Sequence, residues 1–178
     1  MNRIYFREEQ RYTQWWVWLL ISGSYAVSVV PLWYGVYVQS ATGQPWGNNP
    51  TDTGKLAVVA TVMTIFMSAL VWIFAVQKLE TEVAQDGVRF RYLPFIRKWK
   101  FIPSTMIQRY TVGKYTPIST YGGWGIRKGG RKAGNAYTIS GSIGMTLNLT
   151  DGKTILLGTA RKDALQYAME KMMDQQSP

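Results

Sequence analysis

Hydrophobic and polar positions divide the chain into an apolar first part and an alternating second part. Residues 15–38 and 56–76 form two apolar runs that contain no Asp, Glu, Lys or Arg. A helix rises about 1.5 Å per residue, so roughly 20 residues cross a hydrocarbon layer of about 30 Å. One charge at mid-membrane costs roughly 2.5 to 3.5 kcal/mol on insertion scales, so its absence is informative. Both runs are predicted to be transmembrane helices, joined by an outer loop at residues 39–55.

The first run differs from a cleaved secretory signal peptide. It is longer than a typical apolar signal core of roughly 7 to 15 residues, it has no convincing small-x-small cleavage site, and a second apolar run follows it. Aromatic residues mark its two ends, as expected for rings seated at both membrane interfaces. These residues are Trp15, Trp16, Trp18, Trp33, Tyr34 and Tyr37. We therefore predict a retained helical hairpin over residues 15–76.

Basic residues are distributed unevenly around the two runs. Three arginines precede the first run, six basic residues follow the second run up to residue 100, and only Lys55 lies in the loop. Because positive residues stay on the cytoplasmic side, both termini are predicted to be cytoplasmic. The chain is then a multi-pass protein of the bacterial inner membrane, with a cytoplasmic tail at residues 1–14 and a cytoplasmic domain at residues 79–178.

From residue 79 onward, apolar and polar residues alternate, which is typical of β-strands. Asp86-Gly87 and Asp151-Gly152 each separate two alternating segments, and this pattern predicts two β-hairpins. Further strands are predicted between the hairpins at residues 98–102, 106–114, 124–127 and 136–140.

The C-terminal segment has the pattern of an amphipathic helix. Thr159 is the predicted N-cap, and apolar residues recur at helical spacing on one face. They are Leu165, Ala168, Met169 and Met172. About seven antiparallel strands and one covering helix predict a compact barrel or an orthogonal sandwich.

Three segments carry a family resemblance: KLETEVAQDGVRFRYLPF (78–95), KYTPISTYGGWGIR (114–127) and DGKTILLGTARKDAL (151–165). With the preceding hairpin, they resemble the bacterial membrane-anchored pleckstrin-homology-like (PH-like) domain proteins, small membrane proteins with a YGGWGIR-like segment. The resemblance implies a PH-like fold and a membrane setting, and it brings no catalytic residues. PH domains often bind phosphoinositide headgroups through a long basic loop between their first two strands. Here that loop is predicted to be the short, acidic Asp86-Gly87, so this binding mode is not expected.

The composition removes several kinds of chemistry. The chain has no Cys and no His, so disulfides, thiolate metal sites and the commonest general base are absent. Glu80 and Glu82 lie two apart on one strand face and could share acid-base work, but pairing with Arg89 or Arg91 across the hairpin is the simpler prediction. We therefore predict no catalytic residue, no cofactor and no metal site, and no enzymatic activity.

The predicted domain is strongly basic, with 15 Lys and Arg against seven Asp and Glu from residue 79 onward. Two clusters of basic and aromatic residues are candidate contacts for lipid or protein. They contain Arg97, Lys98, Trp99, Lys100, Tyr121, Trp124, Arg127, Lys128, Arg131 and Lys132. Each Lys or Arg held near an anionic leaflet contributes about 1 kcal/mol to membrane binding. The alternative is that the clusters contact only solvent. The rings of Trp99 and Trp124 could sit at headgroup level or be buried in the core.

Three functions fit these patterns. The preferred one is a non-enzymatic inner-membrane protein whose cytoplasmic domain is an interaction module for a protein partner, the anionic leaflet, or both. A second is an accessory subunit of a larger membrane complex, in which the tryptophan-rich hairpin packs on other helices. A third is a lipid-acting enzyme, which requires a pocket with convergent titratable groups. Nucleic acid is not a predicted partner, since no recognised motif is present and membrane tethering explains the positive charge.

Overall fold

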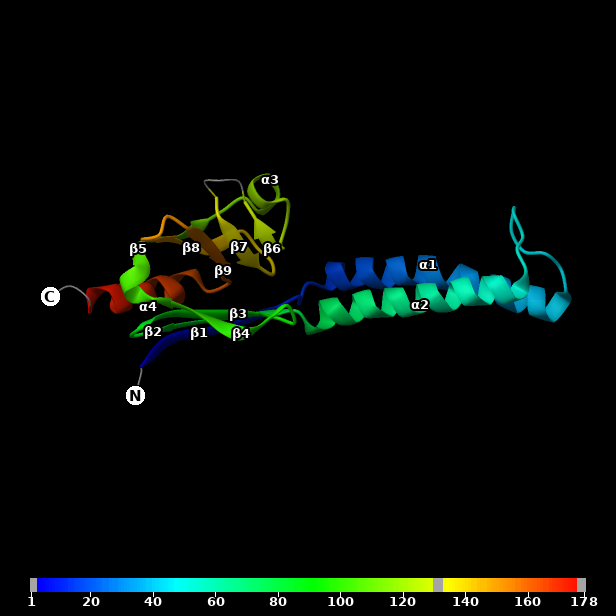
Figure 1. Ribbon diagram of the computed structural model, residues 1–178, viewed down its shortest axis with the longest axis horizontal. Helices are drawn as coiled ribbons and strands as arrows, with labels where there is room; N and C mark the ends of the chain where they lie inside the picture. The colour runs from blue at the N-terminus through cyan, green and yellow to red at the C-terminus, as the bar shows by residue number, and fades with distance from the viewer. Residues whose placement is uncertain (1–2, 130–132, 176–178) are drawn as a thin grey trace. The chain divides into compact units, whose positions relative to one another are not determined.

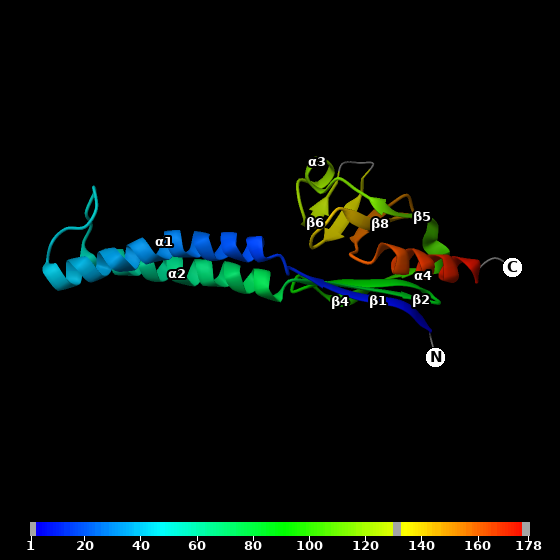
Figure 2. The ribbon, with the colours of Figure 1, turned by 180° about the vertical axis from the view of Figure 1, so that it is seen from behind.

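The computed structural model describes residues 3–129 and 133–175. The chain divides into two compact units. One is a helical hairpin over residues 13–76, and the other is a β-rich unit made of residues 1–12 and 77–178, here called the β domain. Figures 1 and 2 show the helices and strands of both units from opposite sides. The β domain is therefore discontinuous in sequence, because the hairpin is inserted after its first strand.

Two helices form the hairpin, α1 (Trp15–Thr42) and α2 (Thr53–Val76). Both are long and apolar enough to cross a membrane, by length and composition. Each is longer than predicted because polar residues continue the helical hydrogen bonding as far as a capping residue. Gly43 ends α1 in the left-handed conformation, and the carboxylate of Asp52 accepts backbone N–H groups in the first turn of α2. The connecting loop is therefore shorter than the predicted residues 39–55.

The two helices are joined by polar contacts and expose most of their apolar side chains. The indole N–H of Trp33 donates a hydrogen bond to the Thr64 hydroxyl at 2.9 Å, and the hydroxyls of Tyr25 and Ser68 lie 3.4 Å apart. Several large apolar side chains are more than half exposed, including Leu19, Val27, Ile65, Phe66 and Trp72. A helix pair that is apolar on nearly all sides needs a lipid environment or partner helices around it.

The β domain contains two open sheets. The first has the order β1-β2-β3-β4 and is antiparallel throughout. Its strands are β1 (Ile4–Arg11), β2 (Lys78–Ala84), β3 (Gly87–Leu93) and β4 (Ile96–Pro103). The second has the order β5-β8-β9-β7-β6, in which β7 and β9 are parallel. Its strands are β5 (Ile107–Lys114), β6 (Gly125–Lys128), β7 (Asn135–Thr138), β8 (Ile143–Leu149) and β9 (Thr154–Gly158).

Both predicted β-hairpins are confirmed, as β2–β3 and β8–β9. Gly87 is the first residue of β3, and a side chain there would collide with the backbone carbonyl of Ile102 on β4. The described residues form nine strands rather than about seven, and they are not all antiparallel as predicted, since β7 pairs with β9 in parallel. Neither sheet closes on itself. The domain is therefore built from two open sheets rather than a closed barrel.

The first strand is the main departure from the sequence prediction. Residues 1–14 are predicted to be a tail, but Ile4–Arg11 forms β1 and pairs with β2, with Arg11 opposite Lys78. The inward positions of β1 are occupied by Phe6, Glu8 and Gln10, so the segment lacks the apolar alternation of a typical strand. The connection between the first two strands is accordingly residues 12–77, which contain the hairpin, and not Asp86-Gly87.

Buried hydrogen bonds compensate for the polar inward face of β1. The Glu8 carboxylate accepts a hydrogen bond from the Thr159 hydroxyl at 2.7 Å and another from the Ala160 N–H at 2.9 Å. The amide of Gln10 donates to the Gly158 carbonyl at 2.6 Å. Because buried polar groups are stable only when they are paired, these bonds attach β1 to the connection between β9 and the C-terminal helix.

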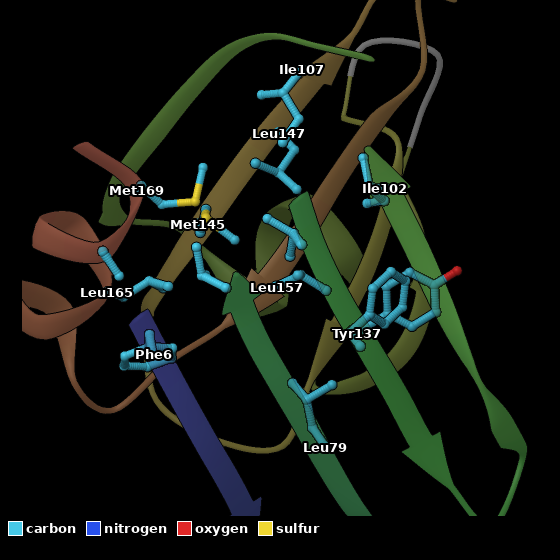
Figure 3. Packing of buried hydrophobic residues seen from close by; sticks show 14 of the residues in the cluster. Phe6, Leu79, Ile102, Ile107, Tyr137, Met145, Leu147, Leu157, Leu165 and Met169 are labelled. Carbon is cyan, nitrogen blue, oxygen red and sulfur yellow. The ribbon is translucent and has the colours of Figure 1, made fainter. Parts of the chain in front are cut away.

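One hydrophobic core is shared by the two sheets and the C-terminal helix α4 (Lys162–Asp174), as Figure 3 shows. The predicted apolar face of α4 is buried, but its N-cap is Arg161 rather than Thr159. Thr159 lies two residues earlier, where its hydroxyl binds Glu8 and accepts the Arg161 N–H. Helix α4 packs against β1, β2 and β5 and so covers the side of the domain where each sheet begins. The last strands of the sheets, β4 and β6, lie on the other side.

Candidate contact surface of the β domain

Charge in the β domain is segregated along the chain. No Asp or Glu occurs from Gly87 to Thr150, a stretch that contains eleven Lys and Arg residues. This stretch forms β3 to β8 and includes both predicted clusters. The acidic residues of the first sheet lie on β1, on β2 and in the turn that follows β2. Strands β4, β5 and β6 therefore carry positive charge that no carboxylate of their own neutralises.

The outer face of the first sheet contains an ion-pair network. Glu80 contacts Arg91 at 2.6 Å and Lys78 at 2.5 Å, which confirms the predicted pairing with Arg91. Burial alone would raise the pKa of Glu80, but the hydrogen bonds from Arg91 and Lys78 outweigh burial and lower it. Glu82 pairs with Arg7 of β1 at 3.2 Å rather than with Arg89. These ion pairs hold the sheet together, and a lowered pKa makes Glu80 a weak base.

The first predicted cluster lies on β4, an edge strand of its sheet. Trp99 is partly exposed and lies outside the core cluster. The Arg91 guanidinium lies over its ring, 4.6 Å from the ring centroid. Arg97 and Lys98 are exposed, and neither has a carboxylate partner among the residues that the structure describes. These two cations are therefore available to an external anion.

Lys100 belongs to the same cluster but lies beside a cavity of about 450 Å³. Its ammonium donates a hydrogen bond to the Tyr137 hydroxyl at 3.3 Å and lies 5.9 Å from the centroid of the Phe90 ring. The carboxylate in the cavity lining, Asp151, pairs with Lys153 at 2.7 Å. The hydrogen bond from Lys153 lowers the pKa of Asp151, so this carboxylate is also a weak base.

The second predicted cluster begins at the bend after α3 (Pro117–Tyr121). Gly122 is in the left-handed conformation and caps α3, and the indole N–H of Trp124 donates to the Gly141 carbonyl at 2.7 Å. Trp124 is partly exposed and lies outside the core cluster. The glycine-rich segment is thus a tight bend that fixes its tryptophan on the domain through a hydrogen bond.

The basic residues of this second cluster follow on β6. Arg127 and Lys128 are exposed, and the Arg127 side chain turns back to donate to the Trp124 carbonyl at 3.1 Å. Tyr121 is fixed by a hydrogen bond from its hydroxyl to the Ala133 carbonyl at 2.8 Å. The predicted contacts Arg131 and Lys132 lie outside the described residues.

The structure brings the described residues of the two clusters to the same side of the β domain. β4 and β6 are the last strands of their sheets, on the side that α4 does not cover. The bond between Lys100 and Tyr137 joins β4 to β7, the neighbour of β6. Arg127 is also close enough to Tyr12 and Tyr92 to affect them: burial raises the pKa of both phenols, and the guanidinium opposes that rise.

Several exposed apolar residues near these clusters are not predicted from the sequence, among them Phe95, Ile118 and Ile126. Phe95 is 59% exposed, Ile118 is 71% exposed and Ile126 is 41% exposed. A usable signal was present for two of them, since Phe95 and Ile118 each follow a proline in a short connection next to basic residues. Apolar residues in such connections have no strand partner and are candidates for contact with another surface.

A scan against protein-family models finds no match to the chain, and a search of curated proteins finds none either. The PH-like resemblance therefore stays a prediction. The support for a function comes from the geometry of the chain itself.

Proposed function

We propose that this chain is a non-enzymatic, multi-pass protein of the bacterial inner membrane, whose cytoplasmic PH-like domain is an interaction module for an anionic partner at the membrane surface. The observation that carries the proposal is the pairing of β1 with β2, the strands on either side of the apolar hairpin. The sequence of the β domain is interrupted by the hairpin, because one of these paired strands precedes it and the other follows it. The fold of the β domain is therefore linked to its anchoring in the membrane.

Only short connections join the β domain to the two helices in the chain. Three residues separate β1 from α1, and one residue separates α2 from β2. Because an extended chain spans at most about 3.6 Å per residue, both connections are short. Paired strands must also lie on one side of a membrane, which supports a shared side for the two termini. The excess of basic residues at that side favours the cytoplasm.

The positive side of the β domain supports an anionic partner. Arg97, Lys98, Arg127 and Lys128 are exposed, and none has a carboxylate partner within the described parts of the chain. An interaction module rather than an enzyme is favoured because Glu80 and the carboxylate lining the 450 Å³ cavity are ion-paired and weakly basic. Such a surface binds a partner through that partner's negative charge and supplies no acid or base for a reaction.

A second function, accessory subunit of a membrane complex, is favoured by the exposed rings of the hairpin. Trp15 is 75% exposed and Trp72 is 58% exposed. Large aromatic side chains are common anchors in interfaces between proteins. Purification in mild detergent with a partner in fixed stoichiometry would favour this function, and the two proposals are compatible.

Cross-linking in native membranes tests the proposed function. The full chain is expected to stay in the membrane after an alkaline carbonate wash and to cross-link to an anionic lipid or an acidic protein. The double variant Arg97→Ser/Lys98→Ser should lose most of that cross-linking, whereas Lys162→Ser, which removes an exposed cation from α4, should not. Release by carbonate would remove the anchoring part of the proposal. Equal cross-linking in the two variants would remove the role of the cluster.

A further inference from the structure

One end of the β domain carries the two residues from which the chain continues toward the apolar helices. These are Arg11 at the end of β1 and Lys78 at the start of β2, which lie opposite each other. We call this the hairpin end of the domain. Lys78 also lies opposite Leu93 of β3, so the turn between β3 and β4 is at the same end. Phe95, in that turn, is 59% exposed.

The second sheet contributes α3 to the hairpin end. Gln10, next to Arg11, donates a hydrogen bond to the carbonyl of Gly158. In the second sheet, Gly158 pairs with Gly144, and the residue before Gly144 pairs with Lys114 at the end of β5. Helix α3 follows Lys114 after two residues, and Figures 1 and 2 both show α3 and β6 together at one end of this domain.

The connection that contains α3 presents an apolar side chain in a fixed position. Ile118 is 71% exposed on α3. The helix is capped by Gly122, whose N–H bonds to the Ile118 carbonyl at 2.8 Å. Trp124 and Tyr115 both donate to the carbonyl of Gly141, at 2.7 and 3.3 Å. Backbone and side-chain hydrogen bonds therefore fix the connection, and Ile118 is mostly exposed on it.

Cations lie near both exposed apolar residues in the sequence. Arg97 and Lys98 follow Phe95 by two and three residues, and Lys114 precedes Ile118 by four. All three are exposed, and none forms a salt bridge within residues 3–129 and 133–175. Apolar protrusions flanked by unpaired cations match the interfacial layer of an anionic membrane, where rings and aliphatic chains meet acyl chains and cations meet phosphates.

We propose that the hairpin end is a membrane-contact surface, in which Phe95 and Ile118 enter the interfacial layer of an anionic leaflet and Arg97, Lys98 and Lys114 bind lipid phosphates. The inference rests on the proposed membrane anchoring and names its partner as anionic lipid. A membrane is favoured over a protein because the protrusions lie at the end from which the chain enters its apolar helices. The contact would fix the orientation of the β domain on the leaflet.

Site-specific labelling tests this contact, because the chain contains no cysteine and any introduced cysteine is unique. Phe95→Cys and Ile118→Cys, each in the full chain, receive an environment-sensitive fluorophore. Tyr167→Cys is the matched control, since Tyr167 is 65% exposed on α4. The proteins are reconstituted in vesicles of neutral phosphatidylcholine, with or without anionic phosphatidylglycerol, that contain a nitroxide quencher on the lipid chain.

The labels at positions 95 and 118 should be quenched about twofold more in anionic than in neutral vesicles, and the label at position 167 should not respond. Arg97→Ser/Lys98→Ser should reduce the quenching at position 95, whereas Lys162→Ser should not. Salt near 1 M, where the Debye length is about 3 Å, should weaken the effect. Two labels on separate connections protect the result against a local folding defect at either one.

Three outcomes would overturn the inference. Labels that stay in water in both kinds of vesicle would exclude the contact, while the proposed anchoring would stand if the chain still resisted carbonate extraction. Equal quenching in neutral vesicles would exclude recognition of anionic lipid. Protection of both labels only after native membrane proteins are added would assign the surface to a protein partner.

Discussion

The β domain contains two buried glutamates whose carboxyl groups have different kinds of partner. Glu80 is 3% exposed and contacts two cations, Arg91 and Lys78. Glu8 is 7% exposed and accepts hydrogen bonds from neutral groups, the Thr159 hydroxyl and the Ala160 N–H. A buried carboxylate is tolerated only with such partners, so each one places strict demands on the strands around it.

The substitution Glu80→Gln should destabilise the β domain at neutral pH by about 1.5 to 3 kcal/mol, because the amide loses the charge-assisted bonds to Arg91 and Lys78. The lowered pKa sets the sign of the pH dependence. Stability from the ionised carboxylate is present above its ordinary pKa of 4.5 and is lost as pH falls through the lower folded value. Urea unfolding of the full chain in micelles, followed by hydrogen exchange of β2, should show the two proteins converging below pH 4.5. A constant difference down to pH 2 would contradict this.

The substitution Trp124→Phe should leave the Gly141 carbonyl without its indole donor and destabilise the connection around α3 by about 1 kcal/mol. Faster hydrogen exchange is expected from residue 115 to residue 125, with little change in β2 and β3. Trp99→Phe is the matched control, because Trp99 contacts Arg91 through its ring and a phenyl ring can replace that contact. Equal effects of the two variants would show that the hydrogen bond is unimportant.

At the scale of elements, β1 shows where sequence patterns lose information. The β2–β3 and β8–β9 hairpins are predictable because each is local: alternation and an Asp-Gly pair lie within a few residues of one another. The inward face of β1 carries the polar residues Glu8 and Gln10, and its partner strand follows only after residues 12–77. A short stretch of sequence therefore shows neither an apolar face nor a nearby partner strand. The burial of β1 depends on donors in the connection between β9 and α4, near the far end of the sequence.

The substitution Glu8→Ala tests whether β1 is part of the β domain. It removes the acceptor for the Thr159 hydroxyl and the Ala160 N–H, and unsatisfied buried donors cost about 1 to 3 kcal/mol each. Hydrogen exchange in β1, β2 and the start of α4 should rise together. Glu9→Ala is the control, since Glu9 lies on the outer face in exposed ion pairs that contribute about 0 to 1 kcal/mol. If the Glu8 variant were as stable as the Glu9 variant, residues 4–11 would not be an integral strand of the β domain.

At the scale of the whole molecule, the strand pairing relates the fold to the topology in the membrane. β1 precedes α1 and β2 follows α2, and the two strands share seven paired positions from Ile4↔Ala84 to Arg11↔Lys78. If the hairpin crosses the bilayer, both strands must therefore lie on one side. Single cysteines can test this in the cysteine-free chain: Asn48→Cys in the loop and Asp174→Cys at the end of α4. A membrane-impermeant thiol reagent added to intact cells should modify position 48 only, and modification of both positions would exclude the predicted orientation.

Local physical chemistry made the helices and most strands predictable from the sequence. Each of the signals lies within one short stretch of the chain. They are the absence of charge over residues 15–38 and 56–76, the two Asp-Gly turns and the apolar face of α4. Only the tertiary structure decided what depends on distant segments. It paired Glu82 with Arg7, placed β1 in the first sheet and brought the described residues of both basic clusters to one side. The physical reason is that such contacts form only when segments distant in the sequence pack together. The sequence shows which charged residues the chain contains, but it does not show which of them form pairs.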